Sequence, residues 1–132
     1  RMLEILTRIC EGNGREGDIE LLESLSKEIR QDSLCGLGQG APNPVVSTLK
    51  HFRHEYEAHI KDKKCPAKVC RALISYEINP ENCVGCTLCA RNCPVDAITG
   101  EAKKTHVIDP DLCIRCGICS QVCNYDAVNV TT

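Results

Sequence analysis

Hydrophobic positions in the first half of the chain recur at helical spacing. Apolar side chains return every three or four residues in three stretches, which predicts three amphipathic helices. The first covers about residues 2–9, the second opens with Asp18 as its cap, and the third opens with Asn43 as cap and Pro44 at the first helical position. We expect a helical bundle over residues 1–60. Its expected apolar faces carry Met2, Leu3, Ile5, Leu6, Ile9, Leu21, Leu22, Leu25, Ile29, Val45, Leu49, Phe52 and Tyr56.

Glycines and polar residues separate the predicted elements. Gly12-Asn13-Gly14 interrupts the first helical pattern, and the glycine-rich segment 35–43 is predicted to be a loop. A polar run then leads to Cys65-Pro-Ala-Lys-Val-Cys70, so we expect residues 61–75 to be a linker.

The last third of the chain repeats itself. Residues 76–83 (YEINPENC) are echoed at 106–113 (HVIDPDLC), and residues 94–98 (PVDAI) are echoed at 124–128 (NYDAV). Two copies of one unit of strand, cysteine loop, short helix and strand are predicted. Together they would form a small α+β domain with pseudo-twofold symmetry over residues 76–132.

Each repeat carries cysteines in the pattern C-x2-C-x2-C-x3-C. Two-residue gaps let three sulfurs of one tight loop reach three irons of a [4Fe-4S] cubane, while the fourth thiolate must come from elsewhere. A pair of zinc knuckles would leave the third cysteine of each loop unexplained. Disulfides are disfavoured because cysteines so close in sequence are poorly placed to bridge. The eight cysteines are Cys83, Cys86, Cys89, Cys93, Cys113, Cys116, Cys119 and Cys123.

Composition agrees with metal binding in a reducing compartment. The chain has 12 cysteines in 132 residues but one Phe, three Tyr and no Trp, so bulky core material is scarce. We find no secretory signal and no apolar run of transmembrane length, and we expect a cytoplasmic protein without a membrane partner. The net charge of −2, from 16 basic and 18 acidic residues, gives no reason to expect nucleic acid.

Residues 76–130 resemble the bacterial two-[4Fe-4S] ferredoxin family in all eight cluster cysteines. The two repeats differ after the fourth cysteine, where the first has Pro94 and the second has Asn124. In that family the last cysteine of each run crosses to the other cluster. The resemblance implies one cluster on Cys83, Cys86, Cys89 and Cys123 and a second on Cys93, Cys113, Cys116 and Cys119. It also implies low-potential, one-electron transfer, and the predicted fold class is a helical bundle followed by a two-[4Fe-4S] ferredoxin domain.

Residues 1–60 resemble the C-terminal helical bundle of the NADH-oxidising flavoprotein subunit of respiratory complex I and of NAD-linked hydrogenases and formate dehydrogenases. The resemblance implies that Cys35 is the fourth ligand of a further [4Fe-4S] cluster, whose other three cysteines precede the bundle in that family. We therefore expect the C-terminal part of a longer subunit. The matching stretches are residues 2–6 (MLEIL), 12–16 (GNGRE), 18–22 (DIELL), 33–38 (SLCGLG) and 51–60 (HFRHEYEAHI).

The two resemblances together imply a function in electron transfer. In the parent protein an FMN would exchange hydride with NAD(P)H, and the terminal clusters would exchange single electrons with other iron-sulfur subunits or soluble ferredoxin. An appended ferredoxin domain is typical of hydrogenase relatives, some of them electron-bifurcating, and of formate dehydrogenases. The chain itself has no recognisable catalytic set. Two alternatives stay open: a domain that mainly docks the subunit, and a free-standing ferredoxin with a helical extension.

Three residues around the linker have metal-ligand chemistry. His59, Cys65 and Cys70 predict a structural zinc site, with His54, His51 or a group outside this chain as the fourth ligand. Reduced thiols in a linker are the alternative. Cys10, among apolar neighbours, is expected to be a small core residue. The Gly12-x-Gly14-x-x-Gly17 pattern is not a dinucleotide fingerprint, because a helix and not a buried strand precedes it.

Overall fold

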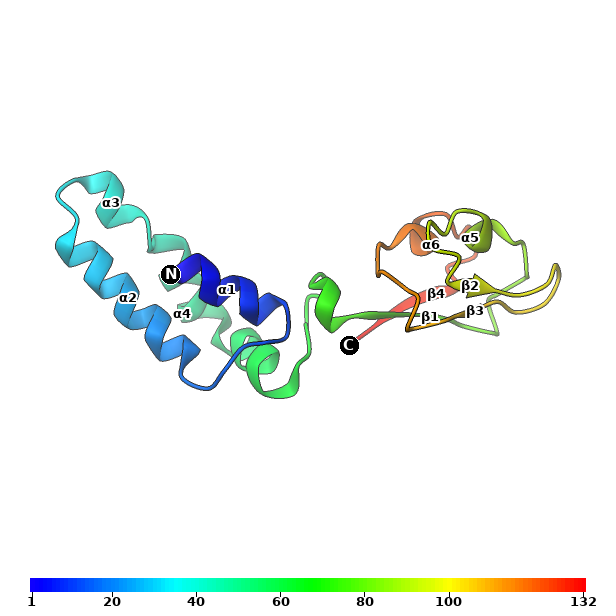
Figure 1. Cartoon of the computed structure of the whole chain (residues 1–132), viewed down its shortest axis with the longest axis horizontal. Coiled ribbons are helices and arrows are strands. Elements are labelled where there is room, and N and C mark those ends of the chain that lie inside the picture. Colours follow the sequence, from blue (N-terminus) through cyan, green and yellow to red (C-terminus); the bar gives the residue numbers. More distant parts are fainter. The chain divides into compact units, whose positions relative to one another are not determined.

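The computed structural model describes all residues 1–132 and divides them into two compact units, Arg1–Leu73 and Ile74–Thr132. Figure 1 shows helices in the first unit and short strands with two small helices in the second. The division lies within the segment 61–75. No helix is both long and apolar enough to cross a membrane.

The first unit is entirely helical. Its α-helices are α1 (Met2–Cys10), α2 (Asp18–Asp32), α3 (Gly36–Gly40) and α4 (Asn43–Glu57), followed by the π-helix η1 (Ala58–Asp62) and the 3-10 helix η2 (Arg71–Leu73). The helices α1, α2, α4 and η1 share one core, because the apolar stripe of each faces the others. Its buried residues are Ile5, Ile9, Ile19, Leu22, Leu49 and Ile60.

The glycines that interrupt the first helical pattern have a packing reason. Gly12 has a φ of +79°, and a Cβ there would stand 2.9 Å from Cδ2 of Leu73. A Cβ on Gly14 would meet Cγ1 of Ile60 at 2.9 Å. After α1 the backbone therefore packs directly against the side chains of Leu73 and Ile60. Only glycine allows so close an approach.

Several sequence predictions for this unit were wrong. The cap positions of α2 and α4 are held by Gly17 and Pro42 instead of Asp18 and Asn43, and Leu3 of α1 is 76 % exposed. The segment predicted as a loop contains α3, a single helical turn. Phe52, expected on the buried face of the third helix, is 49 % exposed. Its φ of −127° and ψ of 29° interrupt α4, and the kink turns this side chain away from the core.

The second unit is built from strands that pair between the two repeats. β1 (Ser75–Ile78) and β2 (Ile98–Thr99) flank α5 (Leu88–Arg91) in the first repeat, and β3 (Val107–Ile108) and β4 (Val128–Thr131) flank α6 (Ile118–Gln121) in the second. β1 pairs antiparallel with β4, and β2 pairs antiparallel with β3. Each repeat thus gives its first strand to a sheet with the second strand of the other.

The repeats also make matching hydrogen bonds beside the strands. The N–H of Asn79 donates to the carbonyl of Ala127 at 2.7 Å, and the N–H of Asp109 donates to the carbonyl of Ala97 at the same distance. Side chains of these residues cap the following turns alike, since Asn79 accepts from the N–H of Glu81 and Asp109 from that of Asp111, both at 2.9 Å. The sequence repeat is therefore a repeat of local structure.

A buried ion pair ties α1 to the start of α2. Asp18, 3 % exposed, accepts hydrogen bonds from the guanidinium of Arg8 and, at 2.9 Å, from the N–H of Arg15. It is the first residue of α2 and not its cap, because Gly17 holds the cap position with a left-handed backbone. The hydrogen bond with Arg8 lowers the pKa of Asp18, although burial opposes this, and the N–H of Arg15 adds to the lowering.

We predict that Asp18→Asn lowers the free energy of unfolding of the first unit by about 2–3 kcal/mol at pH 7, as for other hydrogen bonds to charged groups. Because the folded pKa is depressed, this stability is present above the unfolded pKa of about 4 and is lost as pH falls through the folded pKa. Denaturant unfolding followed by circular dichroism at several pH values measures both effects. Glu20→Gln, which removes an exposed partner of Arg53, is the control and should cost at most about 1 kcal/mol. Equal losses in the two variants would contradict this account.

Candidate metal centres

A cavity in the second unit is lined by cysteines of both repeats. Cys83, Cys86 and Cys89 come from the first cysteine loop, and Cys123 comes from the end of the second. Ile78, Val84, Leu88 and Val128 are among the apolar side chains that complete its wall. The structure thus brings together the four residues predicted for the first cluster.

A second cavity repeats this arrangement with the roles of the repeats exchanged. Cys113, Cys116 and Cys119 line it from the second loop, and Cys93 reaches it from the first repeat. Its other lining residues include Tyr76, Val95, Ile98 and Ile118. In each cavity four thiols stand among apolar groups, the donor set that suits an iron-sulfur cluster.

The cysteine loops reach these positions through left-handed residues on both sides of the middle cysteine. Gly85 and Thr87 flank Cys86 with φ of +67° and +66°, and Arg115 and Gly117 flank Cys116 with φ of +57° and +80°. Glycine relieves the strain at one position of each loop, but at opposite sides of the cysteine. The backbone repeats more closely than the sequence does.

Backbone N–H groups already point at cysteine sulfurs. The N–H of Ala97 lies 3.3 Å from Sγ of Cys93, and the N–H of Ala127 lies 3.4 Å from Sγ of Cys123. Such donors stabilise negative charge on sulfur. Burial nevertheless raises the pKa of Cys89, and burial with the nearby Cys113 and Cys116 raises that of Cys119 to about 11. A metal that binds here has to displace protons from these thiols.

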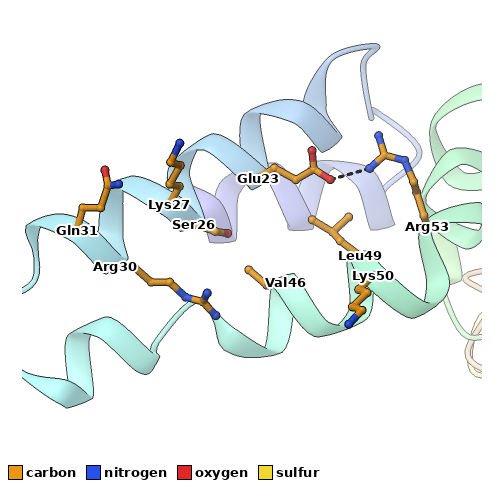
Figure 2. Close-up of a pocket in the computed structure, with 9 residues that line it drawn as sticks. All are labelled: Glu23, Ser26, Lys27, Arg30, Gln31, Val46, Leu49, Lys50 and Arg53. Carbon is orange, nitrogen blue, oxygen red and sulfur yellow. Dashed lines mark hydrogen bonds and ion pairs between the residues drawn. The ribbon is translucent and has the colours of Figure 1, made fainter.

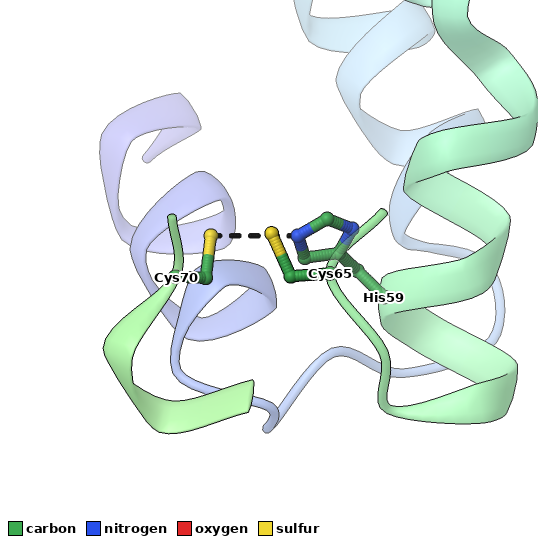
Figure 3. A group of neighbouring side chains, drawn as sticks. All are labelled: His59, Cys65 and Cys70. Atoms are coloured by element: carbon green, nitrogen blue, oxygen red, sulfur yellow. Dashed lines mark hydrogen bonds between the residues drawn. The ribbon is translucent and has the colours of Figure 1, made fainter. Parts of the chain in front are cut away.

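The first unit holds a third group of ligand-type residues. His59, Cys65 and Cys70 bring their ligand atoms within 4.8 Å of one another (Figure 3). Nδ1 of His59 donates to the carbonyl of Glu55 at 2.7 Å, and Nε2 lies 3.4 Å from Sγ of Cys70. Metal-ligating histidines usually donate their other ring nitrogen in this way. The π-helix η1 carries His59 and buries it.

The pKa values of the two thiols of this group are shifted in opposite directions. Burial opposes ionisation of Cys65, but hydrogen bonds from the N–H groups of Cys70 and Val69 and from neighbouring side chains lower its pKa to about 7. Burial, the Cys65 thiol and the nearby Cys10 raise the pKa of Cys70 to about 12. A cation between the sulfurs would remove this repulsion.

Cys10 was predicted to be a small core residue, and this prediction was wrong. It is the last residue of α1, is exposed and not a core residue, and lines the same cavity as His59, Cys65 and Cys70. The proximity of its thiol contributes to the raised pKa of Cys70. The only sequence signal was one more cysteine at a helix end, which has no fixed spacing from the other ligands.

The remaining predicted ligands lie apart from these cavities. His51 and His54 are exposed on α4 and do not line the cavity of His59. Five helical residues place His54 roughly 140° around the helix from His59, which explains the separation. Cys35 is exposed at the cap position of α3.

A groove of about 660 Å³ between α2 and α4 has different chemistry. Figure 2 shows Arg53 of α4 paired with Glu23 of α2 across one end, at 2.7 Å. Val46 and Leu49 provide apolar contacts, and Lys27, Arg30 and Lys50 add positive charge. None of the lining residues is a cysteine or histidine, so this groove is separate from the candidate metal centres.

Comparison with known families agrees with both parts of the chain. Residues 1–59 match the family described as the iron-sulfur binding region of NADH-ubiquinone oxidoreductase-F, and residues 76–130 match the 4Fe-4S dicluster domain. The chain therefore joins an iron-sulfur region of the complex I 51 kDa kind to a domain of the 4Fe-4S dicluster family. This confirms the two resemblances predicted from the sequence.

Individual relatives place the chain more closely. It is 54 % identical over 106 residues to the NADP-reducing hydrogenase subunit HndC of Solidesulfovibrio fructosivorans, which covers 80 % of this chain and 22 % of HndC. It is 45 % identical over 64 residues to an F-type subunit of the NADH-quinone oxidoreductase of Rhizobium meliloti, or 48 % of this chain and 15 % of the relative. The chain thus spans about a fifth or less of the length of these relatives.

We predict that Gly85→Ala disrupts the first cysteine loop. A Cβ there would stand 2.4 Å from the backbone nitrogen of Lys104 and 2.5 Å from its oxygen, on a left-handed backbone. The variant should lose more than about 1 kcal/mol of stability and hold less iron, measured by iron analysis and thermal unfolding. Arg115→Ala is the matched control, because the equivalent position already carries a Cβ at positive φ. Full iron content in Gly85→Ala would contradict the steric role.

Proposed function

We propose that residues 76–132 hold two [4Fe-4S] clusters and serve as a one-electron relay. The ligands are Cys83, Cys86, Cys89 and Cys123 for the first cluster and Cys93, Cys113, Cys116 and Cys119 for the second. When bound, each cluster accepts and releases one electron. The observation that carries this proposal is the division of the eight cysteines between two cavities, with three from one repeat and one from the other in each.

The protein positions the cluster ligands, offsets the charge of their thiolates and excludes water from the clusters. The reciprocal strand pairing favours a pseudo-twofold arrangement of the repeats, in which each repeat holds the other's fourth ligand. Apolar walls exclude water, and backbone N–H groups offset thiolate charge, two factors that set the potential of an iron-sulfur centre. The domain over residues 76–132 depends on this metal for its core, because Ile98 is its only large apolar side chain that is buried.

We further propose that the chain works within an NAD(P)H-linked, multi-subunit hydrogenase or similar oxidoreductase. The likeness of residues 1–59 to the flavoprotein family and the name of HndC support this. Cys35, at the exposed end of the 1–60 helical bundle, would complete a third [4Fe-4S] cluster, and an FMN in the parent protein would exchange hydride with NAD(P)H. Electrons would then pass to other iron-sulfur subunits or soluble ferredoxin in the cytoplasm. Electron bifurcation and formate dehydrogenation belong to the same proposal as alternatives for the whole complex.

A second proposed site is a structural zinc centre formed by His59, Cys65, Cys70 and Cys10. Three thiolates and one imidazole make a closed tetrahedral set of the kind that structural zinc prefers. The hydrogen bond from His59 to the Glu55 carbonyl supports this role, because it leaves Nε2 free for the metal. We propose Cys10 in place of His51 or His54 as the fourth ligand. The centre would fasten the linker segment 61–75 to the end of α1.

Cysteine substitutions test the crossed ligation. Cys123→Ser should change the same cluster as Cys83→Ser, although the two residues belong to different repeats, and Cys113→Ser should change the other. Anaerobic protein should hold about eight irons in these two clusters. Iron analysis and electron paramagnetic resonance of the dithionite-reduced variants would measure this. Spectra of Cys123→Ser that match Cys113→Ser would refute crossing, and wild-type protein without iron would refute the relay.

The zinc centre is tested by Cys10→Ala. Loss of a hydrogen-bond partner of a metal ligand lowers metal affinity by about 10–100-fold. Because Cys10→Ala removes a ligand itself, we expect zinc affinity to fall by more than this. Zinc per chain after chelator dialysis measures this, and the thiolate-to-metal absorption of a Co²⁺ derivative should weaken. His54→Ala is the control on the same unit. If His54→Ala releases zinc and Cys10→Ala keeps it, the fourth ligand is His54 instead.

A further inference from the structure

A buried histidine in the second unit has one ring nitrogen without a partner. His106 is 1 % exposed, and its Nε2 is the one buried side-chain polar atom of the chain that lacks a hydrogen-bond partner. It immediately precedes β3 and corresponds in the sequence repeat to Tyr76 of β1. The two repeats therefore differ in chemistry at one matched, inward position.

The ring of His106 is held in one place. Its Nδ1 lies 3.1 Å from the carbonyl oxygen of Lys104. A Cβ on Gly100 would stand 2.7 Å from Cγ of the ring, so Gly100 makes room for it. The ring lines the first cavity together with Cys83, Cys86, Cys89 and Cys123. Because Nδ1 is engaged by the backbone, Nε2 is the nitrogen left for that cavity.

A buried nitrogen without a partner costs free energy that an apolar ring would not. Thr87 and Tyr125 line the cavity as well, but Nε2 bonds to neither hydroxyl. The rest of the lining is apolar carbon and cysteine sulfur, so sulfur is the natural acceptor. Resting on the cluster sites proposed above, we propose that Nε2–H of His106 donates a hydrogen bond to a sulfur of the first [4Fe-4S] cluster or its thiolates and stabilises the reduced state. His106 is then a positioning and tuning residue, because all four ligands are cysteines.

The proposed hydrogen bond also bears on the charge of the ring. A carbonyl oxygen only accepts, so a ring that donates from Nδ1 to Lys104 and from Nε2 to sulfur carries protons on both nitrogens and a positive charge. The negative cluster and its thiolates attract such a ring, and they do so more strongly after reduction adds an electron. Donor and charge therefore both favour the reduced form of the first cluster.

The second cavity has no such cation at the matched place. Tyr76 lines it, and the Tyr76 hydroxyl would lie 2.8 Å from a Cβ placed on Gly117. The two clusters have equivalent ligand sets, so this difference biases where an electron resides. We expect the first cluster to be the more easily reduced of the two.

His106→Phe and His106→Gln test the proposal in the full chain. The Phe variant keeps a ring but removes the donor, and we expect the ratio of reduced to oxidised first cluster at fixed potential to fall about tenfold, equivalent to about 59 mV. The Gln variant keeps an N–H donor and should recover part of the loss. Potentiometric titration followed by electron paramagnetic resonance measures the ratio for each cluster.

Hyperfine spectroscopy gives a signature that packing alone would not. His106 is the only histidine of Ile74–Thr132, so ¹⁵N-histidine labelling should produce a weak nitrogen coupling to the reduced first cluster that disappears in His106→Phe. Tyr76→Phe is the matched control and should leave that coupling intact. A wild-type protein with both clusters but without the coupling, or a His106→Phe variant of unchanged potential, would overturn the inference. Wild-type protein without iron would instead overturn the proposed cluster sites.

Discussion

Reciprocal hydrogen bonding between the two repeats holds the second unit together. β1 pairs with β4 and β2 with β3, so neither repeat has a sheet of its own. The same exchange carries Cys123 to the loop of Cys83 and Cys93 to the loop of Cys113. Backbone pairing and sulfur placement are thus two results of one topology. A small domain with few large apolar side chains gains from this, because a metal cluster held by both repeats joins them where a core would be thin.

The first unit relies on conventional packing and places its metal-type ligands at the edge of its core. Ile9 and Ile60 are buried in the core, and their neighbours Cys10 and His59 line the adjoining cavity. The sharp exit from α1 over Gly12 and Gly14 allows this closeness. The buried pair of Arg8 and Asp18 holds the start of α2 against α1. The ligand group is therefore positioned by the same contacts that form the helical core.

The cavities of the second unit have equivalent ligands but different surroundings. His106 and Tyr76 occupy matched positions, and Gly85 and Gly117 are placed on opposite sides of the middle cysteine in the two loops. Strict repetition of a motif would give two equal sites. Charge and hydrogen bonding near sulfur affect the reduction potential of a cluster directly. The residues that differ between the repeats would therefore give the two sites different reduction potentials.

The parts of this protein that depend on local spacing along the chain could be predicted from the residues alone. Helical periodicity located the three long helices, the internal repeat predicted the order of strands and short helices, and the cysteine intervals indicated clusters. His59, Cys65 and Cys70 were also recognisable as one group, because they are close in sequence. Features that depend on contacts between distant segments became visible only in the folded chain. It brought Cys10 into the cavity that Cys70 lines, left Phe52 half-exposed where α4 is interrupted, and buried Nε2 of His106 without a partner in a ring that lines a cavity of thiols. The spacing of residues along the chain does not predict these features, because each depends on how segments distant in sequence pack together.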